Sequence, residues 1–167
     1  MAGSFAATVE ARVEADRASC FLYIVPIDLA SIFTGYGPLP AVTGTRNQSG
    51  GWNAPEQTRT VLLSDGSTAQ ELLTAYQQPR YFSYTVSAFS GVLRLLVASA
   101  NGEWWFETDQ PATATLVKWR YAFNARSAWA APLVWFITTL LWRGYMRKAL
   151  RLAKAQLETA AAGQAEQ

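Results

Sequence analysis

A long uncharged and strongly apolar run, residues 127–142, constrains the fold more than any other feature. It is rich in Trp, Leu, Val, Ile and Phe, and it continues into an amphipathic stretch that ends near Leu157. The pattern predicts one long helix, with Ser127 as its cap and Pro132 in its first turn. The first half is apolar on nearly every side, so we expect this half of the helix to be covered all round.

A bilayer, a second subunit or a protein sheet could cover such a helix. The run has 16 residues, fewer than the ~20 that span a bilayer. We therefore expect a buried core helix and no membrane association. A homodimer through the long helix is an alternative, because Trp129, Trp135 and Trp142 cannot all point the same way at helical spacing.

Length and composition indicate one globular domain. The chain has 167 residues, of which 50% are hydrophobic and 16% charged, which suits a single domain with its own core. We expect this domain to span residues 1–157. Residues 158–167 are Ala, Gln, Glu, Thr and Gly, and we expect them to form a disordered tail.

The charged and reactive residues exclude several function classes. The net charge of +2 is spread along the chain, so no nucleic-acid footprint is expected. The chain has no histidine, which excludes His-based triads and His-ligated metals, and we expect neither a metal nor a cofactor. Cys20 is the single cysteine and is predicted to be a buried, unreactive thiol. The first residues do not show a basic region followed by an apolar core, which is the pattern of a secretory signal, so we expect a cytoplasmic protein.

Along the chain, helices stand at the two ends of a run of strands. Phe5–Glu14 alternates like a strand, and Asp16 and Asp28 can each cap a short helix before a Gly/Pro-rich loop at 34–40. Further strands are predicted at 41–48, 57–63, 67–76, 81–89, 92–98, 104–108 and 113–124. Short hairpins imply an antiparallel sheet, so we expect an α+β fold with a curved sheet around the C-terminal helix.

The turn at residues 64–66 sets the register of one hairpin. A three-residue loop with Gly66 in the left-handed conformation places Arg59 opposite Glu71 on the more apolar face. A two-residue loop would shift the register by one and separate this pair.

Alternation along the strands predicts an inner face rich in aromatic side chains. This face is either an ordinary packed core or the wall of an apolar cavity with a few polar groups. Which of Trp104 and Trp105 faces inward stays open. The residues expected to contact a ligand in such a cavity are Val61, Leu73, Phe82, Tyr84, Trp104, Phe106, Trp119, Tyr121, Phe123, Trp129, Phe136 and Leu140.

The hairpin and the strands after it resemble a known family. Arg59, Val61, Asp65 and Gly66, then Glu71, Tyr84 and Trp119, match in order the pattern of the polyketide cyclase/dehydrase branch of the START-like superfamily (SRPBCC, the helix-grip fold). The resemblance covers about residues 5–157. It implies an antiparallel sheet of about seven strands around the C-terminal helix, with two small helices after the first strand.

The resemblance also implies a hydrophobic small molecule or lipid in the cavity between sheet and helix. We expect a binder or carrier, with ligand entry between the loops 34–40 and 90–93 and the helix start near Trp129. The alternative is a cyclase or dehydratase in which Glu71 is a general base and Arg59 stabilises an enolate oxygen. A purely structural ion pair would explain Arg59 and Glu71 equally well.

Overall fold

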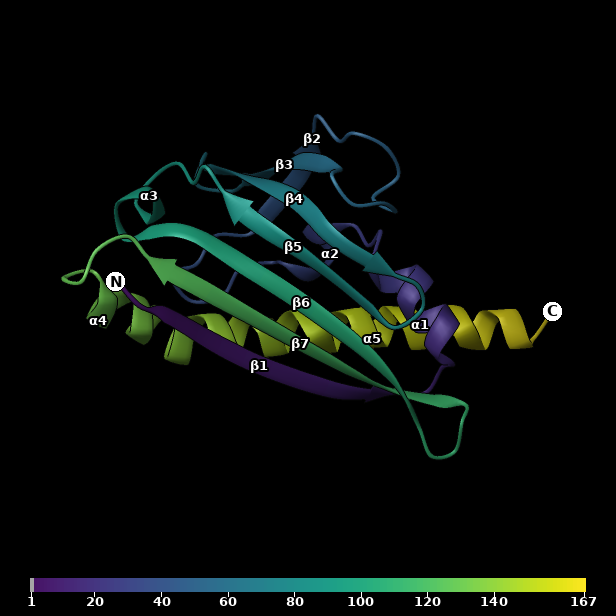
Figure 1. The fold of residues 1–167 in the computed structure, drawn as a ribbon. Helices are drawn as coiled ribbons and strands as arrows, with labels where there is room; N and C mark the ends of the chain where they lie inside the picture. The colour runs from purple at the N-terminus through teal and green to yellow at the C-terminus, as the bar shows by residue number, and fades with distance from the viewer. Residues whose placement is uncertain (1) are drawn as a thin grey trace.

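The computed structural model describes residues 2–167 and has the α+β helix-grip architecture (Figure 1). Seven strands form one antiparallel sheet in the order β1-β7-β6-β5-β4-β3-β2. They are β1 (Ser4–Val13), β2 (Val42–Arg46), β3 (Thr58–Leu63), β4 (Thr68–Gln77), β5 (Tyr81–Ser87), β6 (Val97–Asp109) and β7 (Ala114–Ala125). The sheet curves over the C-terminal helix, which runs along one of its faces.

The helices are short except at the C-terminal end. They are α1 (Arg17–Ile24), α2 (Leu29–Ile32), α3 (Leu93–Leu96), α4 (Ala131–Phe136), the π-helical segment η1 (Ile137–Trp142) and α5 (Arg143–Ala165). The segment α5 packs against β1 and α2, and α2 packs against β2. The helices therefore reach both edges of the sheet and enclose its concave face.

The predicted caps of the two short helices after β1 are confirmed. The Asp16 carboxylate accepts hydrogen bonds from the backbone N–H and the hydroxyl of Ser19, and the Asp28 carboxylate accepts one from the backbone N–H of Ala30. These bonds satisfy N–H groups that the first turn of a helix leaves free. They place α1 and α2 directly after β1, as the sequence predicted.

The predicted hairpin register is also confirmed. Gly66 has a positive φ of 84°, and Arg59 pairs with Glu71 across β3 and β4. The connection between β5 and β6 differs from the prediction. Residues 93–96 form the one-turn helix α3, and the separate strand predicted at 104–108 is the second half of β6. The two segments merge because the polar residues between them, Ser99 and Asn101, hydrogen-bond Asn124 on the outer side of β7 and need no turn.

The long helix starts later than predicted and is not covered all round. Ser127 does not cap it: the cap position is Ala130, and Pro132 fills the first turn. The helix widens into η1, where the Thr138 hydroxyl donates to the Val134 carbonyl at 2.7 Å. Large apolar side chains on the outward side are exposed to solvent, which corrects the expectation of a fully wrapped helix: Trp129, Leu133, Trp135, Phe136 and Leu140.

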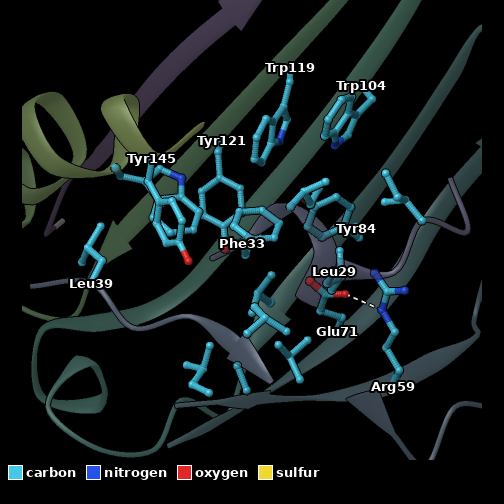
Figure 2. A pocket seen from close by; sticks show the side chains of 18 of the residues that line it. Leu29, Phe33, Leu39, Arg59, Glu71, Tyr84, Trp104, Trp119, Tyr121 and Tyr145 are labelled. Atoms are coloured by element: carbon cyan, nitrogen blue, oxygen red, sulfur yellow. Dashed lines mark hydrogen bonds and ion pairs between the residues drawn. The ribbon is translucent and has the colours of Figure 1, made fainter. Parts of the chain in front are cut away.

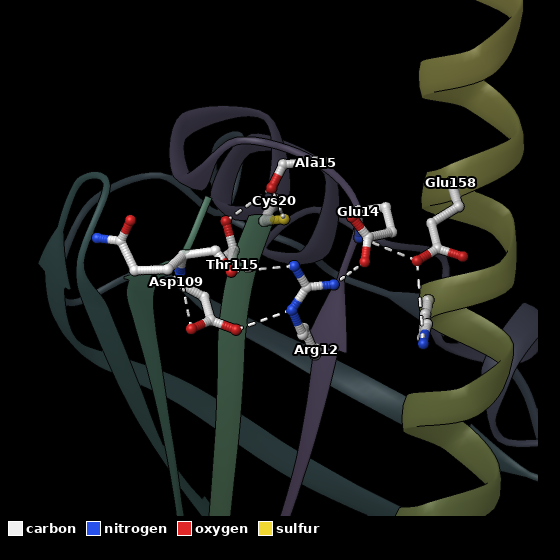
Figure 3. A network of polar contacts seen from close by, with 9 residues as sticks. Arg12, Glu14, Ala15, Cys20, Asp109, Thr115 and Glu158 are labelled. Carbon is white, nitrogen blue, oxygen red and sulfur yellow. Dashed lines mark hydrogen bonds and ion pairs between the residues drawn. The ribbon is translucent and has the colours of Figure 1, made fainter. Parts of the chain in front are cut away.

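The C-terminal residues are helical to Ala165, where the composition predicted a disordered tail. Ala, Gln and Glu are strong helix formers, and a contact to β1 holds this part of the helix. The Glu158 carboxylate accepts a hydrogen bond of 2.9 Å from the backbone N–H of Glu14 (Figure 3). Beside it, Arg12 bonds Glu14 and donates to Asp109 at 2.9 Å, which ties β1, β6 and the helix together at this end of the sheet.

Candidate functional site

A cavity of about 130 Å³ lies between the concave face of the sheet, α2 and the C-terminal helix. Its wall is predominantly apolar and strongly aromatic. Figure 2 shows Trp104, Trp119, Tyr84 and Tyr121 around it, with the Arg59–Glu71 pair at one side. An apolar hollow with a few polar groups is the usual character of a small-molecule site.

Seven of the predicted contact residues line this cavity. They are Val61, Phe82, Tyr84, Trp104, Trp119, Tyr121 and Phe123. Trp104 is thereby the inward member of the Trp104/Trp105 pair, and Trp105 packs against Tyr81 on the other face, with ring centroids 5.5 Å apart.

Five predicted contact residues lie elsewhere. Leu73 and Phe106 are fully packed core residues outside the cavity lining. The ring of Phe21 in α1 packs 5.2 Å from that of Phe106, so α1 fills this end of the sheet. Of the other three, Trp129 is exposed in the turn before α4, and Phe136 and Leu140 are exposed on the outer side of the helix; none of them lines the cavity. Their prediction failed because helical periodicity cannot tell the inner from the outer side of a helix that is apolar all round.

Arg59 and Glu71 form a buried ion pair at the cavity wall. The Nε atom of Arg59 donates to an oxygen of Glu71 at 2.6 Å, and the two side chains are only 7% and 10% exposed. The indole of Trp52 covers the guanidinium, whose Cζ lies 4.0 Å from the ring centroid. The Arg59 guanidinium therefore has a hydrogen-bonded carboxylate on one side and a cation–π contact with Trp52 on the other.

Aromatic stacking builds the rest of the wall. Trp104 and Trp119, on neighbouring strands, stack with ring centroids 4.6 Å apart. Tyr121 contacts both Tyr84, at 6.3 Å, and Trp142 of η1, at 4.9 Å. The sheet and the helix thus meet through rings whose positions fix the shape of the cavity.

Three of the tryptophans around the cavity have an unused hydrogen-bond donor. The Nε1 atoms of Trp52, Trp119 and Trp142 are buried and have no acceptor among residues 2–167. Leaving a buried donor unpaired costs about 1–3 kcal/mol, so such groups in a native protein call for an explanation. Each of these Nε1 atoms is almost fully covered by its neighbours, so a bound molecule could reach one of them only if the surrounding rings shifted.

The tyrosines of the wall are neutral hydroxyls. Burial, and then the nearby charge of Glu71, raise the pKa of Tyr84 well above its ordinary value. Burial likewise raises the pKa of Tyr121, and the neighbouring Tyr84 adds to this effect. At neutral pH both groups can donate a hydrogen bond, and neither is a ready base.

The cavity reaches the loops that the sequence predicted as its entrance. Leu39 and Pro40 of one loop, Phe89 and Leu93 of the other, and Ile137 of η1 contribute to its lining. Tyr145 holds the first loop in place: its hydroxyl donates to the Pro40 carbonyl and accepts from the Gly35 N–H, both at 2.9 Å.

Sequence reasoning missed five aromatic residues of the site: Phe33, Trp52, Phe89, Trp142 and Tyr145. Trp142 and Tyr145 follow the helical spacing that marks Met146 and Leu150 as buried, so the inner side could have been extended back to them. Trp52 gives no such signal, because it lies in an irregular loop and has a positive φ of 57°.

Comparison with known proteins agrees with this geometry. The family model described as polyketide cyclase/dehydrase and lipid transport matches residues 27–158. No curated protein matches the chain significantly.

Among solved structures, truncated norcoclaurine synthase from Thalictrum flavum is 10% identical, with a TM-score of 0.70 over 93% of this chain and 94% of that one. Ginseng major latex-like protein 151 from Panax ginseng is 13% identical, with a TM-score of 0.64 over 92% and 97%. The di-domain aromatase/cyclase BexL of the BE-7585A biosynthetic pathway is 14% identical, with a TM-score of 0.64 over 93% of this chain and 50% of that one. These similarities establish the shared fold.

Proposed function

Because the chain belongs to the polyketide cyclase/dehydrase and lipid transport family, we propose that it binds a hydrophobic small molecule in the cavity between its sheet and its C-terminal helix. The observation that carries this proposal is the apolar, aromatic hollow with the Arg59–Glu71 pair and the Tyr84 hydroxyl on its wall. An apolar hollow with a few polar groups is typical of a small-molecule site, and a ligand with an acceptor atom could also satisfy an indole donor if the rings shift on binding.

The size of the cavity limits the ligand. A volume of about 130 Å³ is close to the ~150 Å³ of an apolar protein cavity that takes up benzene. The cavity of this structure therefore suits one ring, or one ring-sized part of a larger molecule. A longer, lipid-like ligand requires the loops at 34–40 and 90–93 to move apart.

The polar groups of the cavity limit the chemistry of the ligand. The hydroxyls of Tyr84 and Tyr121 stay protonated and line the cavity, and the buried indole N–H groups beside them lack an acceptor. The Arg59 guanidinium is already neutralised by Glu71, so the site offers neutral donors rather than a net charge. This set favours a ring that carries a carbonyl or hydroxyl oxygen over a pure hydrocarbon or a carboxylate.

Binding of two ring compounds of equal shape tests the proposal. Acetophenone and α-methylstyrene differ in one group, an acceptor oxygen against a CH₂. We expect acetophenone to bind about tenfold more tightly, which corresponds to one hydrogen bond of ~1.4 kcal/mol. The variant Trp119→Phe keeps a ring at the position and removes one donor, so the preference should shrink.

Native mass spectrometry of the freshly purified protein provides an independent check. We expect a hydrophobic compound in stoichiometric amount, released on denaturation. If no compound is retained and neither probe binds, the cavity is not a ligand site. Equal affinity for the two probes would keep the site but refute the role of the indole donors.

A cyclase or dehydratase using the same cavity is the second candidate, favoured by one arrangement. Glu71, Arg59 and the neutral hydroxyl of Tyr84 line one cavity wall. Glu71 could accept a proton from a carbon beside a carbonyl, and Tyr84 and Arg59 could stabilise the resulting oxyanion. Since Glu71 is bonded to Arg59 at 2.6 Å, it would have to exchange that partner for the substrate.

The variant Glu71→Gln separates the two functions. An enzyme would keep its fold and its affinity for the ligand and lose turnover. A binder would keep both fold and affinity and have no turnover to lose. Loss of folding would show instead that the ion pair is structural, and Tyr84→Phe would then be the variant in which to measure turnover.

A further inference from the structure

The outer side of the helix start carries an apolar face that the cavity does not use. Trp129, Leu133, Phe136 and Leu140 follow one another at helical spacing and are all exposed, Trp129 to 78%. Leu95 of α3 and Val92, the cap residue before α3, are exposed as well, Val92 to 75%. Because α3 and α4 contact each other at one end of the molecule (Figure 1), we treat these six residues together as the apolar face.

The extent of this face is unusual for a surface that meets only water. Aromatic and aliphatic side chains of this size, about half exposed or more, present on the order of a few hundred Å² of apolar surface. Contiguous patches of that size mark places where a protein meets another apolar phase or partner.

The charge around the apolar face is predominantly positive. Arg94 and Arg126 are joined by a hydrogen bond of 2.7 Å from Arg126 Nε to the Arg94 carbonyl, and both are exposed. Arg143 and Arg147 continue the helical stripe and are exposed too. No Asp or Glu occurs between Glu71 and Glu103 or between Asp109 and Glu158. The carboxylate of Asp65, in the turn near Gly91, is engaged by Ser67.

This charge pattern argues against a second copy of the chain as the partner. An antiparallel pairing about the middle of the stripe would set the Arg126 side chain of one copy beside the Arg143 side chain of the other. A parallel pairing would set each arginine beside its own equivalent. Like charges meet in both arrangements, which costs free energy in either dimer.

A lipid surface with anionic headgroups and an apolar interior suits both the apolar face and the arginines around it. Tryptophan and arginine side chains are favoured at the boundary between lipid headgroups and acyl chains, and each basic residue near an anionic leaflet contributes to attraction. Within residues 2–167, no helix combines the length and apolar character needed to cross a bilayer. We propose that the apolar face docks in the plane of an anionic lipid surface.

The position of the cavity fits this docking. Leu93 and Ile137 line the cavity, and their sequence neighbours Val92 and Phe136 belong to the apolar face. The predicted entrance and the docking face therefore adjoin. A hydrophobic ligand could pass between the bilayer and the cavity without crossing water. The sequence predicted no membrane association from the length needed for a span, and docking in the interface does not require a span.

Vesicle flotation tests the proposal. The probes are vesicles of phosphatidylcholine alone and of phosphatidylcholine with about 30% phosphatidylserine, which supplies the anionic surface charge. We expect the protein to float with the anionic vesicles, and less so as salt is raised. The double variant Phe136→Ser/Leu140→Ser should bind about tenfold more weakly or worse. The double variant Arg143→Glu/Arg147→Glu should lose the preference for anionic vesicles.

Matched substitutions at the other end of the molecule control for charge and hydrophobicity in general. Leu22, on α1, is an exposed leucine, and Arg80 is exposed beside the β4–β5 turn. Leu22→Ser and Arg80→Glu should float like the natural sequence. Equal binding to neutral and anionic vesicles, no binding to either, or the same loss in the controls would overturn the proposal. So would a stable dimer that Phe136→Ser/Leu140→Ser converts to a monomer.

Discussion

The ring of Tyr84 lies directly over Gly102, its partner on the neighbouring strand. A Cβ atom on residue 102 would come within 2.2 Å of the Tyr84 ring and 2.5 Å of its hydroxyl oxygen. Gly102→Ala must therefore push the ring out of place, and the free space beside it is the cavity. We expect a loss of about 1–3 kcal/mol in the free energy of unfolding, together with weaker binding of acetophenone. Urea unfolding and calorimetric titration measure the two effects.

Gly44→Ala is the matched control, since a Cβ on this strand glycine meets nothing within 4 Å. It should be neutral or slightly stabilising, because alanine restricts the unfolded chain more than glycine does. If Gly102→Ala behaved like Gly44→Ala, the close approach of Tyr84 would not shape the cavity.

The Arg59–Glu71 pair predicts strongly non-additive substitutions. Arg59→Met or Glu71→Leu alone leaves one charge buried without its partner and should cost about 3–5 kcal/mol of unfolding free energy. The double variant removes both charges and should cost much less than the sum. Chemical denaturation of the four proteins gives the coupling energy directly.

The exposed pair Arg120–Glu103, with a 3.1 Å contact on the other face of the sheet, serves as comparison. Its single substitutions should each cost about 0–1 kcal/mol, because solvent screens half-exposed charges. Similar costs for the two pairs would mean that the buried pair contributes nothing special to the fold.

The parts of the fold predicted from sequence were those with local causes. The caps at Asp16 and Asp28 and the turn at Gly66 each act within a few residues, and each is confirmed. The Arg59–Glu71 pairing followed from that turn alone. Seven residues of the cavity wall were predicted because strand alternation assigns a face without knowledge of the partner.

The failures share a non-local cause. Phe136 and Leu140 lie on a helix that is apolar on both sides, and Trp129 lies in the turn that leads into it, so only the position of the sheet decides which side is inside. Trp52 contacts the ion pair from a loop, and no pattern in the neighbouring sequence predicts that contact. The residues 158–165 form helix because α5 is already formed and Glu158 bonds the Glu14 backbone.

Cys20 should react slowly with alkylating reagents. Burial raises the pKa of its thiol to about 11, whereas the thiolate is the reactive form. At pH 8 we expect iodoacetamide to modify the native protein at least about a hundredfold more slowly than the urea-unfolded protein. Mass spectrometry of timed samples measures both rates. Comparable rates would show that α1 opens readily or that the thiol is not buried.

Asp16 should make part of the stability pH-dependent. Hydrogen bonds from the hydroxyl and the backbone N–H of Ser19 lower the pKa of its carboxyl below the ordinary value. A group with a lowered folded pKa stabilises fully above its unfolded pKa of ~3.9, and this contribution is lost as pH falls through the folded pKa. Asp16→Ala should cost about 1 kcal/mol at pH 7.

Asp16→Asn isolates the charge, because asparagine caps a helix well at any pH. The natural sequence should be the more stable of the two at pH 7 and lose that advantage below about pH 4. The free energies of unfolding of the natural sequence and of Asp16→Asn, measured across this pH range, test the prediction. A difference that stays constant with pH would contradict the lowered pKa.

Because it lacks a Cβ, Gly144 allows Tyr36 of the loop at 34–40 to pack closely against the long helix. A Cβ on this residue would come within 2.3 Å of the Tyr36 hydroxyl oxygen, while Tyr36 stacks on Tyr145 with centroids 6.1 Å apart. Gly144→Ala gains about 1 kcal/mol in helix propensity but must turn Tyr36 away. We expect little net change in stability, yet faster hydrogen exchange at Gly35 and Leu39, whose amides bond Tyr145 and Tyr36.

The same substitution should speed ligand release, because Leu39 and Pro40 line the cavity. Gly163→Ala is the control: it lies in the same helix with nothing within 4 Å of a Cβ, so it gains helix propensity and leaves the loop alone. It should stabilise slightly and change neither hydrogen exchange at the loop nor the dissociation rate of acetophenone. If both variants released the probe at the natural rate, the loop would not be the entrance and the path would have to pass between α3 and η1 instead.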